Sequence, residues 1–104
     1  AAQGKLTQIS AKTRFVTDKI RAEVQDAASA VNAAEKQIRQ STENLQLTRQ
    51  SLELGRIAFA DGDITLIALN IYETAVADAE LQLLDAQFKY FFYQGIYQTA
   101  IKSL

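Results

Sequence analysis

Apolar residues recur every seven positions through the first part of the chain. The large members of the series are Val24, Val31, Ile38, Leu45, Leu52 and Phe59. A small or polar residue follows three positions after each, at Ala27, Ala34, Ser41, Thr48, Gly55 and Gly62. Alternating steps of three and four are typical of the contact line, or seam, of a helical coiled coil. The pattern predicts a helix over roughly residues 3–60. A weaker, more polar seam extends it backward through Leu6, Ser10, Thr13, Thr17 and Ile20.

The second part of the chain repeats this rhythm. Large residues seven apart are Leu69, Val76, Leu83, Tyr90, Tyr97 and Leu104. Interleaved with them are Tyr72, Ala79, Ala86, Tyr93 and Ala100. With no proline to interrupt it, this series predicts a second helix over roughly residues 65–103. Small residues in both series predict that the two helix backbones approach closely, with large side chains of one helix over small ones of the other.

The stretch "FADGDIT", residues 59–65, separates the two series. Gly62 suits the left-handed conformation that ends many helices. Asp63 or Thr65 suits the capping position of the next helix. Because the connection is short, the helices are expected to run antiparallel. The predicted fold is therefore all-α: a long antiparallel two-helix coiled-coil hairpin that occupies residues 1–104 as a single domain.

A second apolar stripe on the second helix consists of Ala77, Leu81, Leu84, Phe88 and Phe91. The segment "FKYFFYQGIY" adds aromatic residues, for which we expect packing between helices, with a membrane-interface belt as the alternative. Such a surface is larger than soluble monomers usually expose. The hairpin is thus expected to associate further, either as a dimeric four-helix bundle or as one stave of a larger helical barrel.

The amino-acid composition limits the kinds of site that the chain can form. The chain has no Cys, His, Met, Trp or Pro and a net charge of −1. The usual ligands for zinc, haem and iron–sulfur clusters are missing, and so are the common Ser–His and Cys–His pairs. We therefore expect no enzyme, catalytic residue, metal or cofactor, and no nucleic-acid partner. No apolar run is long enough for a membrane-spanning helix. Because the chain starts at Ala1, we expect a processed protein or an excised piece.

Residues 44–101, "NLQLTRQSLELGRIAFADGDITLIALNIYETAVADAELQLLDAQFKYFFYQGIYQTAI", resemble the hairpin repeat of the TolC-type outer membrane factor family. In that family a long Ala-rich helix reaches an aromatic residue, then a Gly, then a Ser or Thr and a run of aliphatic residues. The matching residues here are Phe59, Gly62 and Thr65, followed by Leu66, Ile67 and Leu69. The spaced tyrosines Tyr90, Tyr93 and Tyr97 are similar to the end of the family's returning helix.

The resemblance implies a function in transport. Three protomers, each with two hairpins, would form a helical duct across the periplasm of a Gram-negative cell, beneath a β-barrel in the outer membrane. The duct would conduct drugs, metal ions or proteins in tripartite efflux or type I secretion. Its partners would be a periplasmic adaptor protein and an inner-membrane pump, and it would self-associate as a homotrimer. With one hairpin and no strands, the chain is expected to be a fragment of such a protein.

The predicted partner-binding residues form the tip: Phe59, Asp61, Gly62, Asp63, Ile64 and Thr65. For Asp61 and Asp63 we favour turn and capping chemistry over an acidic ring that gates the channel. Calcium binding ranks lower because the EF-hand spacing is missing. Gly55 is interpreted as a close-packing position rather than a hinge, and Tyr72 as a seam residue beside a solvated Glu73.

Two other functions stay open. A hairpin of the periplasmic adaptor itself is one, because "GDIT" is similar to the "GAIS" of some adaptor tips. Adaptor tips, however, follow an Arg, Leu, Ser pattern, and from Arg56 the corresponding positions are Ala60 and Ile67. The other is a structural coiled-coil module that dimerises without any role in transport.

Overall fold

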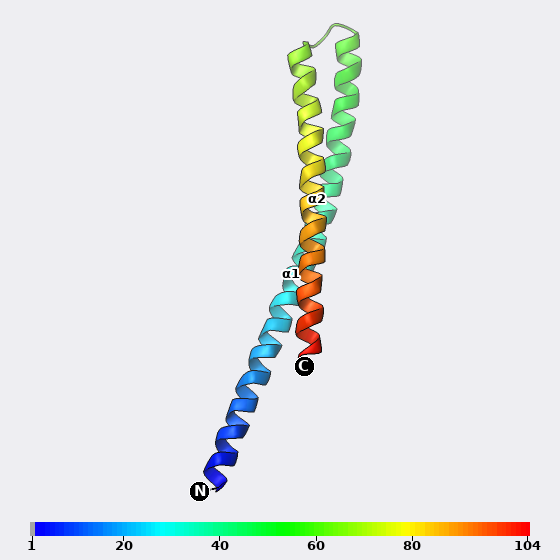
Figure 1. The fold of residues 1–104 in the computed structure, drawn as a ribbon. Coiled ribbons are helices and arrows are strands. Elements are labelled where there is room, and N and C mark those ends of the chain that lie inside the picture. The colour runs from blue at the N-terminus through cyan, green and yellow to red at the C-terminus, as the bar shows by residue number, and fades with distance from the viewer. Residues whose placement is uncertain (1) are drawn as a thin grey trace. The chain divides into compact units, whose positions relative to one another are not determined.

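The computed structural model describes residues 2–104, with side chains from residue 4 onward. Helix α1 spans Ala2–Ala60 and helix α2 spans Leu66–Lys102, and a turn connects them (Figure 1). The described residues contain no strand. The all-α, two-helix prediction is thus confirmed, and each predicted helix end lies within one residue of the observed end.

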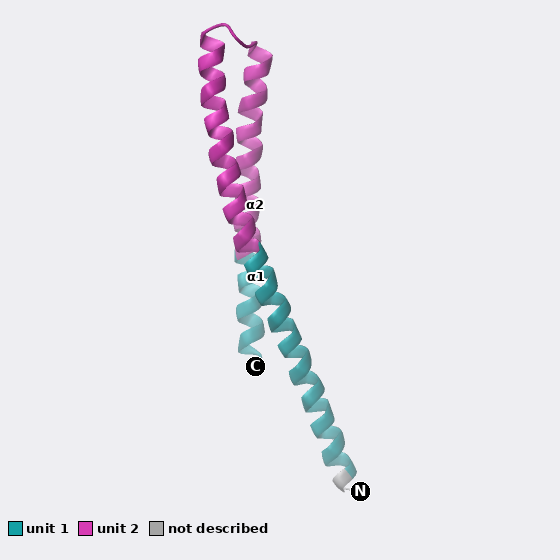
Figure 2. Ribbon diagram, turned by 180° about the vertical axis from the view of Figure 1, so that it is seen from behind, with its two compact units in different colours: residues 1–33, 91–104 teal, residues 34–90 magenta. Residues whose placement is uncertain are grey.

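The chain divides into two compact units (Figure 2). Unit 2 comprises residues 34–90: the later part of α1, the turn and the first part of α2, which together form an antiparallel hairpin. Unit 1 comprises residues 1–33 and 91–104, which are the beginning of α1 and the end of α2. The two helices continue through both units.

The core of unit 2 lies along the predicted seam. Every buried residue of the unit is a seam member: Ala34, Ser41, Leu45, Leu52, Gly55, Leu69, Ala79 and Ala86. The most deeply buried are small, since Ala79 and Ala86 are each only 1% exposed. Close contact between the two backbones therefore holds the hairpin together, as expected for a seam that alternates large and small side chains.

Gly55 and Tyr72 show how the large and small positions fit. A β-carbon added to Gly55 would come 2.8 Å from Cδ2 of Tyr72 and 3.2 Å from its Cε2. The tyrosine ring therefore occupies the space that any other residue at position 55 would fill. This contact supports the close-packing interpretation of Gly55, and it confirms Tyr72 as a seam residue. Glu73 is exposed, as predicted.

Polar groups near the seam are satisfied locally. The buried Ser41 accepts a hydrogen bond from Nε2 of Gln37 at 3.5 Å. Thr48 donates to the carbonyl oxygens of Asn44 and Leu45, both at 3.0 Å. Among the described residues, no buried side-chain nitrogen or oxygen lacks a partner. The seam thus accepts hydroxyl residues without leaving polar atoms unpaired.

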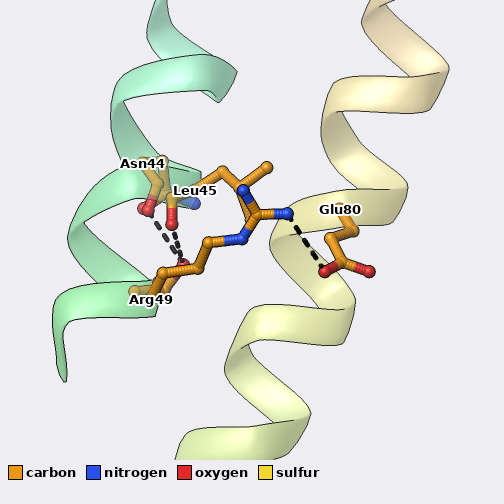
Figure 3. A network of polar contacts seen from close by, with 5 residues as sticks. Asn44, Leu45, Arg49 and Glu80 are labelled. Carbon is orange, nitrogen blue, oxygen red and sulfur yellow. Dashed lines mark hydrogen bonds and ion pairs between the residues drawn. The ribbon is translucent and has the colours of Figure 1, made fainter. Parts of the chain in front are cut away.

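An ion pair joins the two helices of unit 2. Arg49 on α1 lies 3.5 Å from the carboxylate of Glu80 on α2, and both side chains are more than half exposed (Figure 3). Two further pairs, Arg56–Glu53 and Lys89–Asp85, lie within single helices. Exposed pairs of this kind contribute only about 0–1 kcal/mol, so packing rather than charge sets the hairpin.

In unit 1 the seam is shorter than predicted. Ala27 is buried, while Val24, Val31, Tyr93, Tyr97 and Ala100 are half-buried. Farther toward the N-terminus, α2 has ended at Lys102, and α1 is exposed from residue 4 to residue 16. The predicted continuation through Leu6, Ser10 and Thr13 is therefore wrong as an intramolecular contact, because α1, at 59 residues, is 22 residues longer than the 37-residue α2. Leu104, also predicted in the seam, is 66% exposed.

The aromatic residues of α2 separate into two sets. Tyr90, Tyr93 and Tyr97 belong to the seam and are half-buried. Phe88, Phe91 and Phe92 are 71%, 70% and 58% exposed. Packing between helices was predicted for the whole segment, and the half-buried tyrosines show it within the hairpin. Phe88 and Phe91 belong to the second stripe, which was expected to need a further partner, and Phe92 lines a groove together with residues of α1.

Candidate functional site

The turn brings all six predicted tip residues together. Helix α1 ends in a Schellman arrangement, in which the amide of Asp63 donates to the carbonyl of Ala58 at 2.8 Å and the amide of Gly62 donates to that of Phe59 at 3.0 Å. Gly62 has φ of +77°, the left-handed conformation that this motif requires. The predicted role of Gly62 in ending the helix is confirmed.

Thr65 caps the second helix. Its hydroxyl accepts a hydrogen bond from the amide of Ala68 at 3.2 Å, and its carbonyl accepts one from the amide of Leu69 at 3.1 Å. This is the geometry of an N-cap residue, three positions before the bonded amide. Of the two predicted caps, the structure therefore selects Thr65 over Asp63.

Most of the tip is open to solvent. Asp61, Gly62, Asp63 and Thr65 are exposed, and Ile64 is half-buried. Phe59 was predicted as the last large residue of the seam, and it is 40% exposed, close to the 38% of the seam residue Tyr72. Part of its ring is therefore open at the tip.

The first turns of α2 add apolar residues that the predicted site did not include. Leu66, Ile67 and Ile71 are 57%, 75% and 65% exposed. A depression of about 450 Å³ on this face is lined by Ile67, Asn70, Ile71, Thr74, Ala75 and Asp78. The first four follow the spacing i, i+3, i+4, i+7, which forms the hole that a side chain of a facing helix enters in a coiled coil. The spacing of Ile67 and Ile71 was the available signal in the sequence.

A smaller hollow of about 260 Å³ lies beneath the turn. Its lining residues are Ser51, Leu54, Gly55, Ala58, Ile64 and Tyr72. Ile64 thus contributes its side chain to the inner side of the tip, while the two aspartates beside Gly62 remain outside. The site therefore combines an apolar surface with two exposed carboxylates.

The second apolar stripe faces away from α1, as its position in the heptad predicts. Leu81, Leu84 and Phe88 are 65%, 62% and 71% exposed, and Ala77 is exposed. At about 100° per residue, this stripe is centred about 150° around α2 from the seam. Helix α2 of unit 2 thus presents two coiled-coil faces, and α1 occupies one of them.

Helix α1 carries a matching patch in unit 2. Leu47 and Leu54 are 62% and 68% exposed, and the smaller residues Ser51 and Ala58 alternate with them at the same three- and four-residue steps. The two helices of the hairpin therefore each present an apolar face beyond the contact that they share.

The described residues contain no group of three or more His, Cys, Asp or Glu side chains placed to hold a metal ion. None of the described helices has the length and apolar character needed to cross a membrane. Comparison with family models, curated proteins and solved structures finds no match to this chain.

Proposed function

We propose that this hairpin is a wall segment of a helical transport duct of the TolC type, with the tip as its docking end. In this role the chain performs no covalent chemistry. Its contribution is to pack beside neighbouring hairpins and to present Phe59, Ile67 and the tip aspartates to a periplasmic adaptor. Conduction of the substrate is a property of the assembled channel and not of this hairpin alone.

The placement of the two faces on α2 carries the proposal. In a closed ring, the directions from one helix to its two neighbours differ by about 90° when there are four helices and by about 150° when there are twelve. The seam and the second stripe of α2 are about 150° apart. This separation supports a wide ring of helices over a compact four-helix bundle.

Charge supports contact between α2 of one hairpin and α1 of the next. Within unit 2, α2 carries Glu73, Asp78, Glu80 and Asp85 against the single basic residue Lys89. The unit-2 part of α1 carries Lys36, Arg39, Arg49 and Arg56 against three glutamates. Opposite charge favours this pairing over contact between two α2 helices, although exposed pairs add little energy each.

Photo-cross-linking in the cell envelope tests the ring. The chain has no Cys, so Leu84→Cys and Leu54→Cys can be introduced together into the protein as a Gram-negative cell makes it, and both can carry a benzophenone. Irradiation is expected to link three protomers covalently, as seen on a denaturing gel, because one probe lies on each apolar face of the hairpin. The control carries the same probes on Gln46→Cys and Glu73→Cys, which are exposed but lie off both apolar faces. Equal cross-linking in the two variants, or recovery of the protein from the cytoplasm, would contradict the proposal.

Photo-cross-linking tests the tip. A benzophenone attached to Ile67→Cys is expected to capture a protein that contains a long helical hairpin flanked by lipoyl-like β segments. The same probe on Gln46→Cys, an exposed position of α1 away from the turn, serves as the control. Capture of the same protein from both positions, or of none from Ile67→Cys, would count against a docking role.

A further inference from the structure

Unit 1 contains an open groove between its two helical segments. The groove has a volume of about 770 Å³. Glu23, Asp26 and Ala30 of α1 line one side, and Phe92 and Ile96 of α2 line the other. Phe92 is 58% exposed and Ile96 is 44% exposed, so the apolar wall is uncovered. Gly95 also lines the groove, and a β-carbon placed there would meet no atom within 4 Å. The groove therefore has room for another helix.

Unit 1 also contains a helical face without an intramolecular partner. In residues 4–21 of α1, apolar and threonine side chains follow steps of three and four along one side: Leu6, Ile9, Thr13, Val16 and Ile20. Leu6, Ile9 and Val16 are 65%, 60% and 52% exposed. We call residues 4–21 the overhang, because α2 does not reach along them. Their spacing is that of a coiled-coil seam.

Charge along one edge of α1 distinguishes the overhang from the groove. Lys5, Lys12 and Lys19 are spaced by seven beside the apolar face of the overhang, and the next residue in the series is Asp26. The sign therefore changes where the groove begins. Counting all charges, the overhang holds five Lys or Arg and one Asp, whereas the groove is lined by Glu23 and Asp26. Neither Lys19 nor Asp26 forms an ion pair within the described part of the chain.

We propose that the overhang of a second copy of this chain occupies the groove, and that the exchange is reciprocal. A two-fold axis near residue 22 of α1 relates the copies, so their α1 helices run antiparallel along unit 1. Each groove then becomes a three-helix bundle. In this register Val16 of one copy faces Ala27 of the other, and Thr13 faces Ala30. Lys19 of each copy faces Asp26 of the other.

The alternatives within unit 1 are less favourable. Side-by-side parallel overhangs would bring lysines of like position together, which is destabilising. Contact between two grooves would bring the acidic linings together and leave both overhangs uncovered. The reciprocal antiparallel arrangement covers both apolar surfaces and opposes their charges, so it is the self-pairing that the surfaces of unit 1 favour.

This inference does not rest on the proposed transport function. The tip and the second stripe of Leu81 and Leu84 lie in unit 2 and take no part in the pairing. A duct requires neighbouring hairpins that run parallel, whereas the two copies in this pair run antiparallel. The proposed pair is therefore an assembly of two copies of this chain and not a part of the duct. A negative result for one assembly therefore leaves the other standing.

Sedimentation equilibrium of the 104-residue chain tests the pairing. The expected species is a dimer. Val16→Asp, placed on the exposed face of the overhang, is expected to raise the dimer dissociation constant by more than about tenfold with unchanged helix content. The matched control is Leu84→Asp in unit 2, which is expected to change the constant by less than about twofold. A monomeric wild-type chain, or a dimer disrupted by Leu84→Asp and not by Val16→Asp, would overturn the proposal.

A charge swap tests the register. Lys19→Asp alone and Asp26→Lys alone are each expected to weaken the dimer, because each places like charges opposite one another. The double variant restores opposite charges in both reciprocal pairs and is expected to restore the dissociation constant. If the double variant dimerises no better than the single variants, the antiparallel register is wrong.

Discussion

The ring of Tyr72 lies so close to Gly55 that a β-carbon on Gly55 would approach its Cδ2 to 2.8 Å. The contact joins α1 and α2 less than two turns of α1 below the turn at Gly62. It therefore fixes the helix separation near the tip, where the hollow lined by Ile64 begins.

Gly55→Ala is expected to destabilise the hairpin by about 1 kcal/mol. Overpacking against the ring costs about 1–3 kcal/mol, and the better helix propensity of alanine returns up to about 1 kcal/mol. Urea unfolding followed by circular dichroism measures the difference. Gly95→Ala is the control, because a β-carbon there meets open space, and it is expected to stabilise the chain. Stabilisation by both substitutions would show that the ring of Tyr72 moves aside freely.

Gly62→Val is expected to lower the free energy of unfolding by about 1–2 kcal/mol, because a residue with a β-carbon is strained in the left-handed conformation. Gly62→Asn is the matched control, since asparagine tolerates this conformation better than other non-glycine residues. Thermal unfolding compares the two, and helix content at low temperature is expected to stay the same. Equal losses in both variants would argue against the left-handed cap as the cause.

Thr65→Ala is expected to cost about 1 kcal/mol, because it removes the side-chain acceptor for the amide of Ala68. Thr65→Ser keeps that acceptor and is expected to preserve stability. Asp63→Ala separates the two capping hypotheses: it is expected to change stability by less than about 0.5 kcal/mol, as surface substitutions usually do. A larger loss from Asp63→Ala than from Thr65→Ala would assign the cap to the aspartate.

Ala79→Leu is expected to destabilise the hairpin by about 1–3 kcal/mol, because the 1% exposed alanine leaves no space for a larger side chain. Ala77→Leu makes the same chemical change two residues earlier, on the exposed stripe, and is expected to leave the hairpin fold intact. Urea unfolding at low protein concentration keeps association from masking the difference. Similar effects at both positions would contradict the observed orientation of α2.

The sequence allowed the hairpin to be predicted because the same signal repeats over many heptads. Each buried residue of unit 2 occupies a predicted seam position, and the single left-handed glycine lies at the predicted turn. Local chemistry was less decisive where two residues suited one role, as Asp63 and Thr65 did. Their separation from the start of α2 decides the cap, and a shift of two residues in the helix boundary exchanges them.

The errors lie where a heptad position lacks a facing helix. Leu6 continues the spacing correctly, but α2 does not extend far enough to face it, and Leu104 lies beyond the end of its own helix at Lys102. Periodicity reports which side of a helix a residue occupies, whereas burial depends on the length of the other helix.

The depth of Ala79 and Ala86 in the seam has a thermodynamic consequence. No large side chain among the described residues is fully buried, so the isolated hairpin removes little apolar area from water when it folds. Its heat capacity of unfolding should accordingly be small for a chain of this length. Association with neighbours would add the missing burial, so the melting temperature should rise with protein concentration.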